Sequence, residues 1–324
     1  MAWLTPNGGW GESNTALISG QGCSLLVDTL WDLPRTTAML TAFGPKLESA
    51  PIRRVVNTHA DGDHWFGNEM VGADEIISTK SAARSMKQHG PGQMKYVDTV
   101  SMVFRAISRL PLPNRADWRV AAEYFEGMLR PFDFTNIKPA LPTDTFSGRL
   151  RLDVGGREVM LIEVGPAHTS GDLIVHLPDA RIVFAGDVLF HGTTPVLWDG
   201  SSRNWIKACE RIIDLKPETV VPGHGAIADL EAVEAIRKYW QFLRTVVHRH
   251  WEKGRSASQA AAHIVRSDEF LRQPFAKWDG QERIVINVYA IYRRLMGRKR
   301  SVSVFRRLRL LREAALLAQD IVDD

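Results

Sequence analysis

Residues 57–64 read Asn57-Thr58-His59-Ala60-Asp61-Gly62-Asp63-His64, a stretch that places four side chains able to bind a metal within six residues. In an extended segment alternate side chains share one face, so we expect His59, Asp61 and Asp63 to project together. A turn at Gly62 would bring His64 beside them. The stretch therefore predicts a metal-binding loop.

Three further candidate ligands each follow a short apolar run that is typical of a buried strand. They are His168 in Gly-Pro-Ala-His-Thr, Asp187 in Phe-Ala-Gly-Asp and His224 in Val-Val-Pro-Gly-His-Gly. Binding sites of layered α/β proteins collect at the ends of strands. Imidazole together with carboxylate is the ligand mix of catalytic transition-metal sites that leave a position open for water. We therefore expect the seven side chains to converge on bound metal.

The remaining sequence predicts an α/β protein with a helical insertion. Apolar runs indicate a hairpin around Gly20-Gln21-Gly22 and strands at 53–57, 76–77, 158–164, 172–177, 181–185 and 219–221. Helices are expected after Pro34, over 204–215 and beyond residue 230. From about 80 to 140, large apolar side chains recur at roughly helical spacing, which predicts the insertion. Its aromatic residues suit either an insertion core or a lid over a planar ligand: Trp118, Tyr124, Phe125, Phe132 and Phe134.

Positive charge is concentrated near the C-terminus. The chain of 324 residues has 41 Lys+Arg against 37 Asp+Glu, a formal net charge of +4. Nine basic residues and no acid fall between 293 and 312, so the rest of the chain carries −5. The nine are Arg293, Arg294, Arg298, Lys299, Arg300, Arg306, Arg307, Arg309 and Arg312. Such a segment is either a solvated helix face or tail, or a docking strip for nucleic acid, anionic lipid or an acidic carrier protein.

Composition and motifs argue against several other classes of protein. No run of about 18 apolar residues occurs, so a membrane-spanning helix is not expected, and the N-terminal residues do not resemble a secretory signal. With only Cys23 and Cys209, a reduced, cytoplasmic setting is the expectation. A Gly-x-Ser-x-Gly elbow, a P-loop and a His-Glu-x-x-His motif are missing. His191 lies four residues beyond Asp187 in the sequence, where it would donate to the site, carry protons or pack the loop.

These motifs resemble, in content and order, those of the metallo-β-lactamase superfamily. The His-x-His-x-Asp-His signature corresponds to residues 59–64, and the later motifs to 165–172, 186–187 and 222–225. The segment Leu25–Thr29 fits as well. The resemblance runs from about residue 14 to 228 and implies a four-layer αββα sandwich with a two-metal site at one edge of the sheets. We accordingly assign 1–296 to a catalytic domain with an insertion at about 80–140, and 297–324 to a basic C-terminal helix or tail.

The resemblance implies a first metal held by His59, Asp61 and His168, a second held by Asp63, His64 and His224, and Asp187 as the bridge between them. Asp63 would also orient the nucleophile, and Asp28 would orient a ligand histidine. Asp61 departs from the signature, which has histidine there. A carboxylate weakens the acidification of bound water and, as a harder ligand, suits iron or manganese better than imidazole does. Zinc is expected on family grounds, with iron and manganese as alternatives.

The resemblance also implies metal-dependent hydrolysis, because a metal lowers the pKa of bound water from about 15.7 towards 7 and polarises a carbonyl. Segments 57–68, 204–209 and 281–292 further resemble the thioesterase/cyclases of bacterial aromatic polyketide pathways. This implies ring closure and thioester release of a carrier-bound poly-ketone in antibiotic biosynthesis, with an acyl carrier protein docked on the C-terminal arginines. An ester, lactone or β-lactam hydrolase, a phosphodiesterase or nuclease, and a di-iron redox protein stay open as alternatives. The basic segment lacks the interleaved aromatic residues that nucleic-acid binding favours.

Overall fold

Two mixed β-sheets form the centre of the protein. The computed structural model describes residues 1–5, 9–110, 115–298 and 302–323. The first sheet has the strand order β1-β2-β3-β4-β5-β6 and the second β11-β10-β9-β8-β7. The strands of the first sheet are β1 (Ala2–Trp3), β2 (Thr15–Ser19), β3 (Ser24–Val27), β4 (Ile52–Val56), β5 (Glu75–Thr79) and β6 (Asp144–Phe146). Those of the second are β7 (Arg149–Val154), β8 (Arg157–Glu163), β9 (Leu173–Leu177), β10 (Ile182–Phe190) and β11 (Thr219–His224).

The sheets pack face to face through alternate residues of their strands. In β2, Ala16 and Ile18 are buried in the core between the two sheets. Leu17 points to the opposite face and packs with Met39 and Phe43 of the first helix. Because the side chains of a strand alternate between faces, and both faces are covered here, these strands read as continuous apolar runs.

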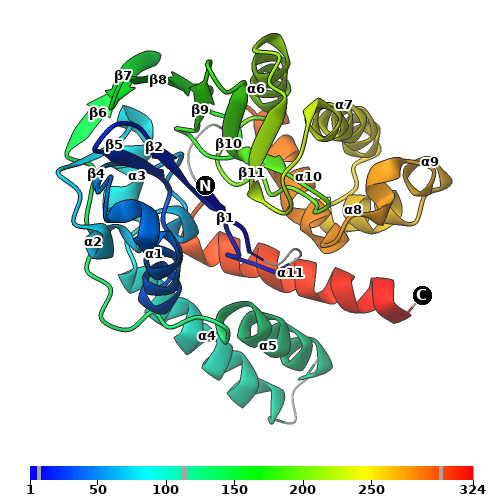
Figure 1. Ribbon diagram of the computed structural model, residues 1–324. Coiled ribbons are helices and arrows are strands. Elements are labelled where there is room, and N and C mark those ends of the chain that lie inside the picture. Colours follow the sequence, from blue (N-terminus) through cyan, green and yellow to red (C-terminus); the bar gives the residue numbers. More distant parts are fainter. Residues whose placement is uncertain (6–8, 111–114, 299–301, 324) are drawn as a thin grey trace.

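Helices cover the outer face of each sheet, which gives the expected four layers (Figure 1). The helix α1 (Leu33–Leu47) begins just before Pro34, whereas the sequence predicted a start after it, because Asp32 accepts a hydrogen bond from Arg35 N and Pro34 occupies the first turn. The second sheet contacts α6 (Ser202–Asp214) and α7 (Leu230–Glu252). No helix among the described residues is long and apolar enough to cross a membrane.

The remaining helices are α2 (Asn68–Val71), α3 (Lys80–Gln88), α4 (Gly92–Ser108), α5 (Arg115–Leu129), α8 (Ala257–Val265), α9 (Asp268–Leu271), α10 (Ile284–Leu295) and α11 (Val304–Asp323), with the 3₁₀ turns η1 (Gly62–His64), η2 (Pro274–Lys277) and η3 (Gln281–Arg283). The helices α3, α4 and α5 occupy the predicted insertion. Two strands that follow it, β6 and β7, were not predicted. Strand β7 lies at a sheet edge, and its Arg149, Arg151 and Asp153 are exposed, so it lacks the apolar run that marks the other strands.

The aromatic side chains of the insertion pack among themselves and on the sandwich. The rings of Phe104 and Trp118 lie 5.1 Å apart, which joins α4 to α5. Phe132 and Phe134 contact the Trp31 ring at 4.6 and 5.0 Å. Of the two roles open from the sequence, these contacts favour packing.

The C-terminal helix α11 packs against the rest of the protein, and Leu310 and Ala314 are buried. It contacts α5 and α10, and in Figure 1 it runs between the sandwich and the helices α4 and α5. Arg312 forms an ion pair with Asp117 of α5 at 3.1 Å and lies 4.7 Å from the centre of the Trp118 ring. Arg312 therefore faces the insertion, and does not belong to a solvated strip as the sequence suggested. Lys299 and Arg300 lie outside the described residues.

Candidate metal centre

The loop that follows β4 is held by buried amide side chains. Asn57 Nδ2 donates to the His64 carbonyl at 2.9 Å, and Asn68 Nδ2 donates to Asn57 Oδ1 at 2.8 Å. The turn η1 begins at Gly62, where a Cβ would lie 2.5 Å from the ring of Phe66. The predicted turn at Gly62 is therefore present, and the ring of Phe66 leaves no room there for a larger residue.

The three later candidate ligands lie in strands of the second sheet or in a loop that follows one. His168 follows β8, in a loop where Asp172 accepts hydrogen bonds from two backbone amides at 2.8 and 2.9 Å. Asp187 lies inside β10 and His224 is the last residue of β11, so the prediction that both follow their strands was wrong. The pairing of β10 with β11 shifts register at Gly186, whose φ of 50° is readily adopted by glycine. Beyond this shift both strands continue into the site, β10 with Asp187 and β11 with His224.

The first group of candidate ligands consists of His59, Asp61 and His168, whose ligand atoms all lie within 4.8 Å of one another. His168 Nε2 is 3.0 Å from Asp61 Oδ2 and 3.4 Å from Asp187 Oδ2. His59 Nε2 is 3.7 Å from the same Asp187 oxygen. The structure thus brings together the three residues expected to hold the first metal and places Asp187 beside them.

The second group consists of Asp63, His64 and His224. His224 Nε2 lies 3.5 Å from Asp63 Oδ2 and 3.2 Å from Asp187 Oδ2. His64 Nε2 lies 3.1 Å from Asp187 Oδ1 and 3.7 Å from Asp63 Oδ2. Asp187 therefore contacts both groups, which is the position that a bridging ligand requires.

The four histidines present the same nitrogen to the centre. In each ring Nδ1 has a partner outside the cluster: Thr58 Oγ1 for His59, Asp28 Oδ2 for His64, and the carbonyls of Val196 and Glu12 for His168 and His224. The inward Nε2 atoms of His59 and His64 and Oδ1 of Asp187 are buried without a hydrogen-bond partner. Buried polar atoms are almost always satisfied. Orphaned nitrogen and carboxylate atoms that point at one another fit divalent metal ions.

Asp28 is not itself a candidate ligand but contacts one, His64, and the neighbouring Thr58. One carboxylate oxygen accepts from Thr58 N at 2.7 Å, and the other contacts Thr58 Oγ1 at 2.7 Å and His64 Nδ1 at 2.9 Å. Its backbone has a φ of 60°, an uncommon conformation that aspartate tolerates better than most residues. The structure places Asp28 where it fixes the orientation of the His64 ring, the role that the family resemblance implies.

The carboxylates and imidazoles of the cluster shift one another's pKa values. Burial lowers the pKa of His168, but its hydrogen bond with Asp61 and the charges of Asp187 and Asp61 raise it to about 9. Burial also lowers the pKa of His64, and the surrounding carboxylates of Asp187, Asp63 and Asp28 raise it well above its usual range. Since metals bind the deprotonated ligands, metal binding would displace these protons.

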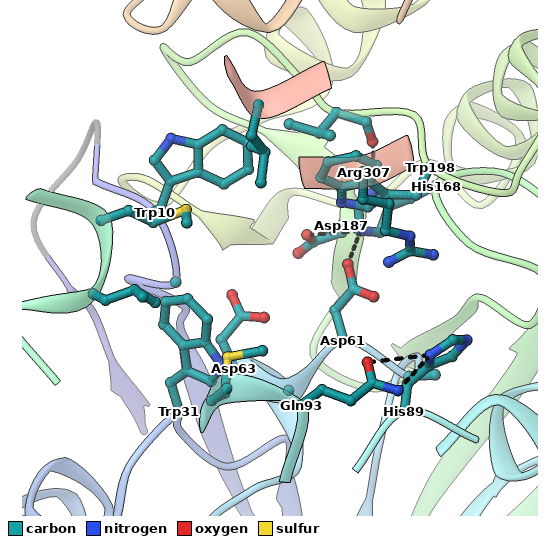
Figure 2. A pocket seen from close by; sticks show the side chains of 18 of the residues that line it. Trp10, Trp31, Asp61, Asp63, His89, Gln93, His168, Asp187, Trp198 and Arg307 are labelled. Atoms are coloured by element: carbon teal, nitrogen blue, oxygen red, sulfur yellow. Dashed lines mark hydrogen bonds and ion pairs between the residues drawn. The ribbon is translucent and has the colours of Figure 1, made fainter. Parts of the chain in front are cut away.

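An apolar cavity of about 200 Å³ opens onto the cluster. Figure 2 shows Trp10 and Trp31 on one side, Trp198 on the other, and the three candidate aspartates between them. Much of the remaining wall is apolar, with Met94, Met128 and Leu129 from the insertion and Val304, Leu308 and Leu311 from α11. The cluster therefore forms the floor of a largely apolar pocket.

Several residues of this pocket were not predicted. His89, Gln93, Arg283 and Arg307 line it, and none has a spacing pattern that marks it in the sequence. His191, predicted to act near the cluster, is not among the lining residues. Its Nδ1 contacts the Ala226 carbonyl at 2.9 Å and its backbone amide donates to the His224 carbonyl at 3.0 Å, so it contacts the loop beside a candidate ligand. The insertion aromatics Trp118, Tyr124, Phe125, Phe132 and Phe134 do not line the cavity either.

The family model of the metallo-beta-lactamase superfamily matches residues 8–224 of the chain, which is more than half of its length. The chain belongs to this superfamily. Membership implies divalent metal ions, which the two His/Asp groups fit. In this metallo-beta-lactamase superfamily protein the match ends at His224, so the helices α7 to α11 lie beyond it.

Curated proteins and solved structures resemble the chain at low identity. The alpha subunit of 2,4-dinitroanisole O-demethylase from Nocardioides sp. (strain JS1661) is 25% identical over 234 residues, which cover 71% of this chain and 58% of that protein. The acyl-coenzyme A thioesterase MBLAC2 of Gallus gallus is 23% identical over 272 residues, covering 79% of this chain and 88% of that protein. The inverting sec-alkylsulfatase Pisa1 from Pseudomonas sp. superposes with a TM-score of 0.63 at 18% identity, over 88% of this chain and 48% of that one. This chain thus spans about half to nine tenths of these relatives.

Proposed function

We propose that the protein is a metal-dependent hydrolase of thioesters or related carbonyl compounds with a compact, apolar acyl group. One observation carries the proposal: two groups of three ligands share Asp187 at the floor of an apolar cavity. A carbonyl compound with an apolar acyl group could fill such a cavity and place its carbonyl against the floor.

The residues fit two divalent metals, and we propose zinc, with iron or manganese as alternatives because Asp61 is a carboxylate. Bound metal would supply Lewis acidity towards the carbonyl and acidify a water at neutral pH. His59, Asp61 and His168 would hold one ion and Asp63, His64 and His224 the other. The carboxylate of Asp63, 3.5 Å from His224 Nε2, would also accept a hydrogen bond from the attacking water and orient it.

The walls of the cavity contribute by excluding water. Trp10, Trp31 and Trp198 surround the floor, and the rings offer faces on which an acyl group packs. In a dry pocket the charges of the floor act on the substrate more strongly than they would in water. The substrate would therefore be held by apolar contacts and activated at the carbonyl alone.

The cavity volume bears on the size of the acyl group. A cavity of about 150 Å³ is large enough to hold benzene, so about 200 Å³ accommodates roughly one substituted ring. A poly-ketone of aromatic polyketide pathways would have to keep most of its length outside. The acyl-coenzyme A thioesterase among the relatives supports thioester hydrolysis, and the demethylase that is named for an aromatic ether supports an aromatic substrate.

An acyl carrier protein is proposed as a partner, since thioester substrates are commonly presented on carriers. Of the nine C-terminal basic residues, Arg298, Arg306 and Arg309 are described and exposed. Their positive charge suits an acidic carrier. Replacing Arg306 and Arg309 together by glutamate should slow turnover of a carrier-bound thioester at low salt and leave a small soluble thioester unaffected.

The function is tested by metal reconstitution and a substrate panel. Metal-depleted protein would be reloaded with zinc, iron or manganese and offered an aryl thioester, an ester, a lactone, a β-lactam, a phosphodiester and an aryl methyl ether. We expect metal-dependent cleavage of the thioester at the highest kcat/KM. Preferred cleavage of the phosphodiester or the ether, or full thioester cleavage without metal, would contradict the proposal.

A matched pair of variants separates chemistry from folding. His224→Ala removes one candidate ligand, and we expect turnover to fall by at least about a hundredfold while the fold persists, because loss of a ligand disrupts the second group. His248→Ala is the control, since that histidine is exposed on α7 and contacts only Glu252 at 3.4 Å in the described structure. The control should behave as the unaltered protein in turnover and in metal content.

A further inference from the structure

We propose that Arg307 on α11 binds an anionic group of the substrate, so that the protein selects compact apolar acyl compounds that carry a carboxylate or a comparable anion. This inference rests on the proposed hydrolase function and adds the class of substrate to it. It concerns a helix outside the segment that matches the superfamily.

The first step is the charge of the cavity wall. Apart from the candidate metal ligands, the fully charged side chains among the described lining residues are two arginines, Arg283 and Arg307. The rest of the wall is mainly tryptophan, methionine, leucine, valine and phenylalanine. Each arginine has an acidic neighbour in the protein, Asp199 for Arg307 and Glu282 at 4.0 Å for Arg283. A ligand that fills this cavity would suit the wall best if it is apolar and has one anionic group that reaches an arginine donor not used by these neighbours.

The two arginines differ in what they do within the protein. Arg283 is 3% exposed, stacks over the Trp10 ring at 4.6 Å and donates to the carbonyls of Thr194 and Gly9 at 3.4 Å. These contacts join η3 to the N-terminal loop and give Arg283 a structural role. Arg307 is the better candidate for contact with a ligand.

The side chain of Arg307 is held by contacts with Asp199 and Trp198. Its Nη2 pairs with Asp199 Oδ2, and its Cζ lies 5.0 Å from the centre of the Trp198 ring. Asp199 is itself anchored, because its other oxygen accepts from Val302 N at 2.8 Å. Arg307 Nε is buried and has no hydrogen-bond partner among the described residues. Because Nε is buried, the donors that could meet an anion in the cavity are those of the Nη groups that Asp199 does not use, and the rigid plane of the guanidinium keeps them oriented.

The location of the guanidinium determines where the anion would lie. Figure 2 shows it beside the Asp61 carboxylate, at the side of the cavity formed by Trp198. Burial raises the pKa of Asp61. The hydrogen bond and charge of His168, the charge of His59 and, after these, the charge of Arg307 outweigh burial and lower it. An anionic substrate that enters next to Asp61 would be repelled by that carboxylate, and Arg307 offsets the repulsion. The anion would thus lie near the first group of ligands.

The experiment compares two substrates that differ by one charge. Zinc-loaded protein would be given a benzoyl thioester of N-acetylcysteamine and its ring-carboxylated analogue. We expect a lower KM for the carboxylated compound. In Arg307→Gln this KM should rise on the order of tenfold or more, as for the loss of a charge-assisted hydrogen bond, while the KM of the neutral compound changes less than about twofold.

Two further variants keep the comparison interpretable. Arg307→Lys retains the charge and its attraction to Asp199, so it should fold and show an intermediate KM for the carboxylated compound. Arg119→Gln is the control, because this arginine of α5 is exposed, lies 4.0 Å from Glu123 and does not line the cavity. It should leave both KM values unchanged.

Specific results would overturn the inference. Equal KM values for the two compounds in the unaltered protein would overturn it. An equal rise of both KM values in Arg307→Gln, together with altered zinc content, would also overturn it. That result would mean that Arg307 serves to balance the charge of Asp61. Failure of every thioester to react would contradict the proposed function, and the inference would then be decided by binding. Tryptophan fluorescence should show benzoate binding more tightly than benzyl alcohol, with the difference abolished in Arg307→Gln.

Discussion

Asp28 illustrates how a residue outside the ligand set can control the centre. Asp28→Asn keeps the shape and the left-handed backbone, which asparagine adopts readily, but removes the negative charge that faces His64. We expect metal affinity to fall by about ten- to a hundredfold with little change in the free energy of unfolding. Equilibrium dialysis with metal analysis measures the first quantity and denaturant unfolding of the metal-free protein the second. Asp74→Asn, an exposed carboxylate, should change neither.

The protonation of His168 gives metal binding a pH dependence of known sign. Its pKa is raised to about 9 in the metal-free protein by Asp61 and Asp187, which outweigh burial. A proton on its inward nitrogen blocks a ligand position, so apparent affinity should rise with pH, by at least about tenfold for each unit below about 9, because His64 releases a proton as well. Competition with a chromophoric chelator measures the slope, and calorimetry in buffers of different ionisation enthalpy counts the released protons. An affinity independent of pH would show that the ring is neutral before the metal arrives.

At the scale of residues, the sequence singled out side chains that the structure brings together, but not the pocket above them. His59, Asp61, Asp63 and His64 form one local motif, and their spacing alone predicts a metal-binding loop. Trp10, His89 and Arg307 come to the cavity from segments that are far apart in the chain. Their role depends on tertiary packing, and no local pattern encodes it.

At the scale of elements, α11 is the clearest case in which composition misled. Its arginines suggested a solvated strip, yet its leucines pack on the protein and line the cavity. Helix α1 was predicted to within about one turn, because Pro34, which suggested it, lies in its first turn. Strands β6 and β7 were not predicted, because an edge strand with a charged outer face resembles a loop in composition.

Helix α11 should therefore contribute to global stability. Leu310 is 2% exposed and lies outside the cavity lining, so Leu310→Ala should lower the free energy of unfolding by about 2–5 kcal/mol through the loss of buried methyl groups. Phe305→Ala, on the same helix but 86% exposed, should change it by less than about 0.5 kcal/mol. Urea unfolding of both variants provides the comparison. Similar small effects at the two positions would mean that α11 frays from the body in solution.

At the scale of the whole molecule, metal should act as a ligand of the folded state. The cluster gathers three carboxylates and four imidazoles from both sheets, and the unfolded chain cannot reproduce that arrangement. Free zinc at about a hundred times its Kd should stabilise the fold by about 2.7 kcal/mol. Thermal unfolding with increasing zinc, and with a chelator, measures the effect as a rise and a fall in Tm. A Tm that does not respond to zinc would contradict a shared site between the sheets.

The charge of the whole molecule has a different meaning in the structure than in the sequence. Net charge of +4 suggested a basic surface, but Arg307 and Arg312 point inward to Asp199 and Asp117. Their charges stabilise contacts inside the protein, and association with polyanions depends on the exposed arginines alone. Global charge could be counted from the sequence, whereas its placement required the fold.

The route of the chain has a consequence for the nascent protein. The ribosome synthesises the sandwich and all seven candidate metal ligands before α11, and domains generally begin to fold during synthesis. The metal centre can therefore assemble on the growing chain while one wall of the cavity is still unmade. Because Val304, Leu308 and Leu311 are synthesised after every other lining segment, this wall of the cavity is completed after all seven candidate ligands are in place on the chain.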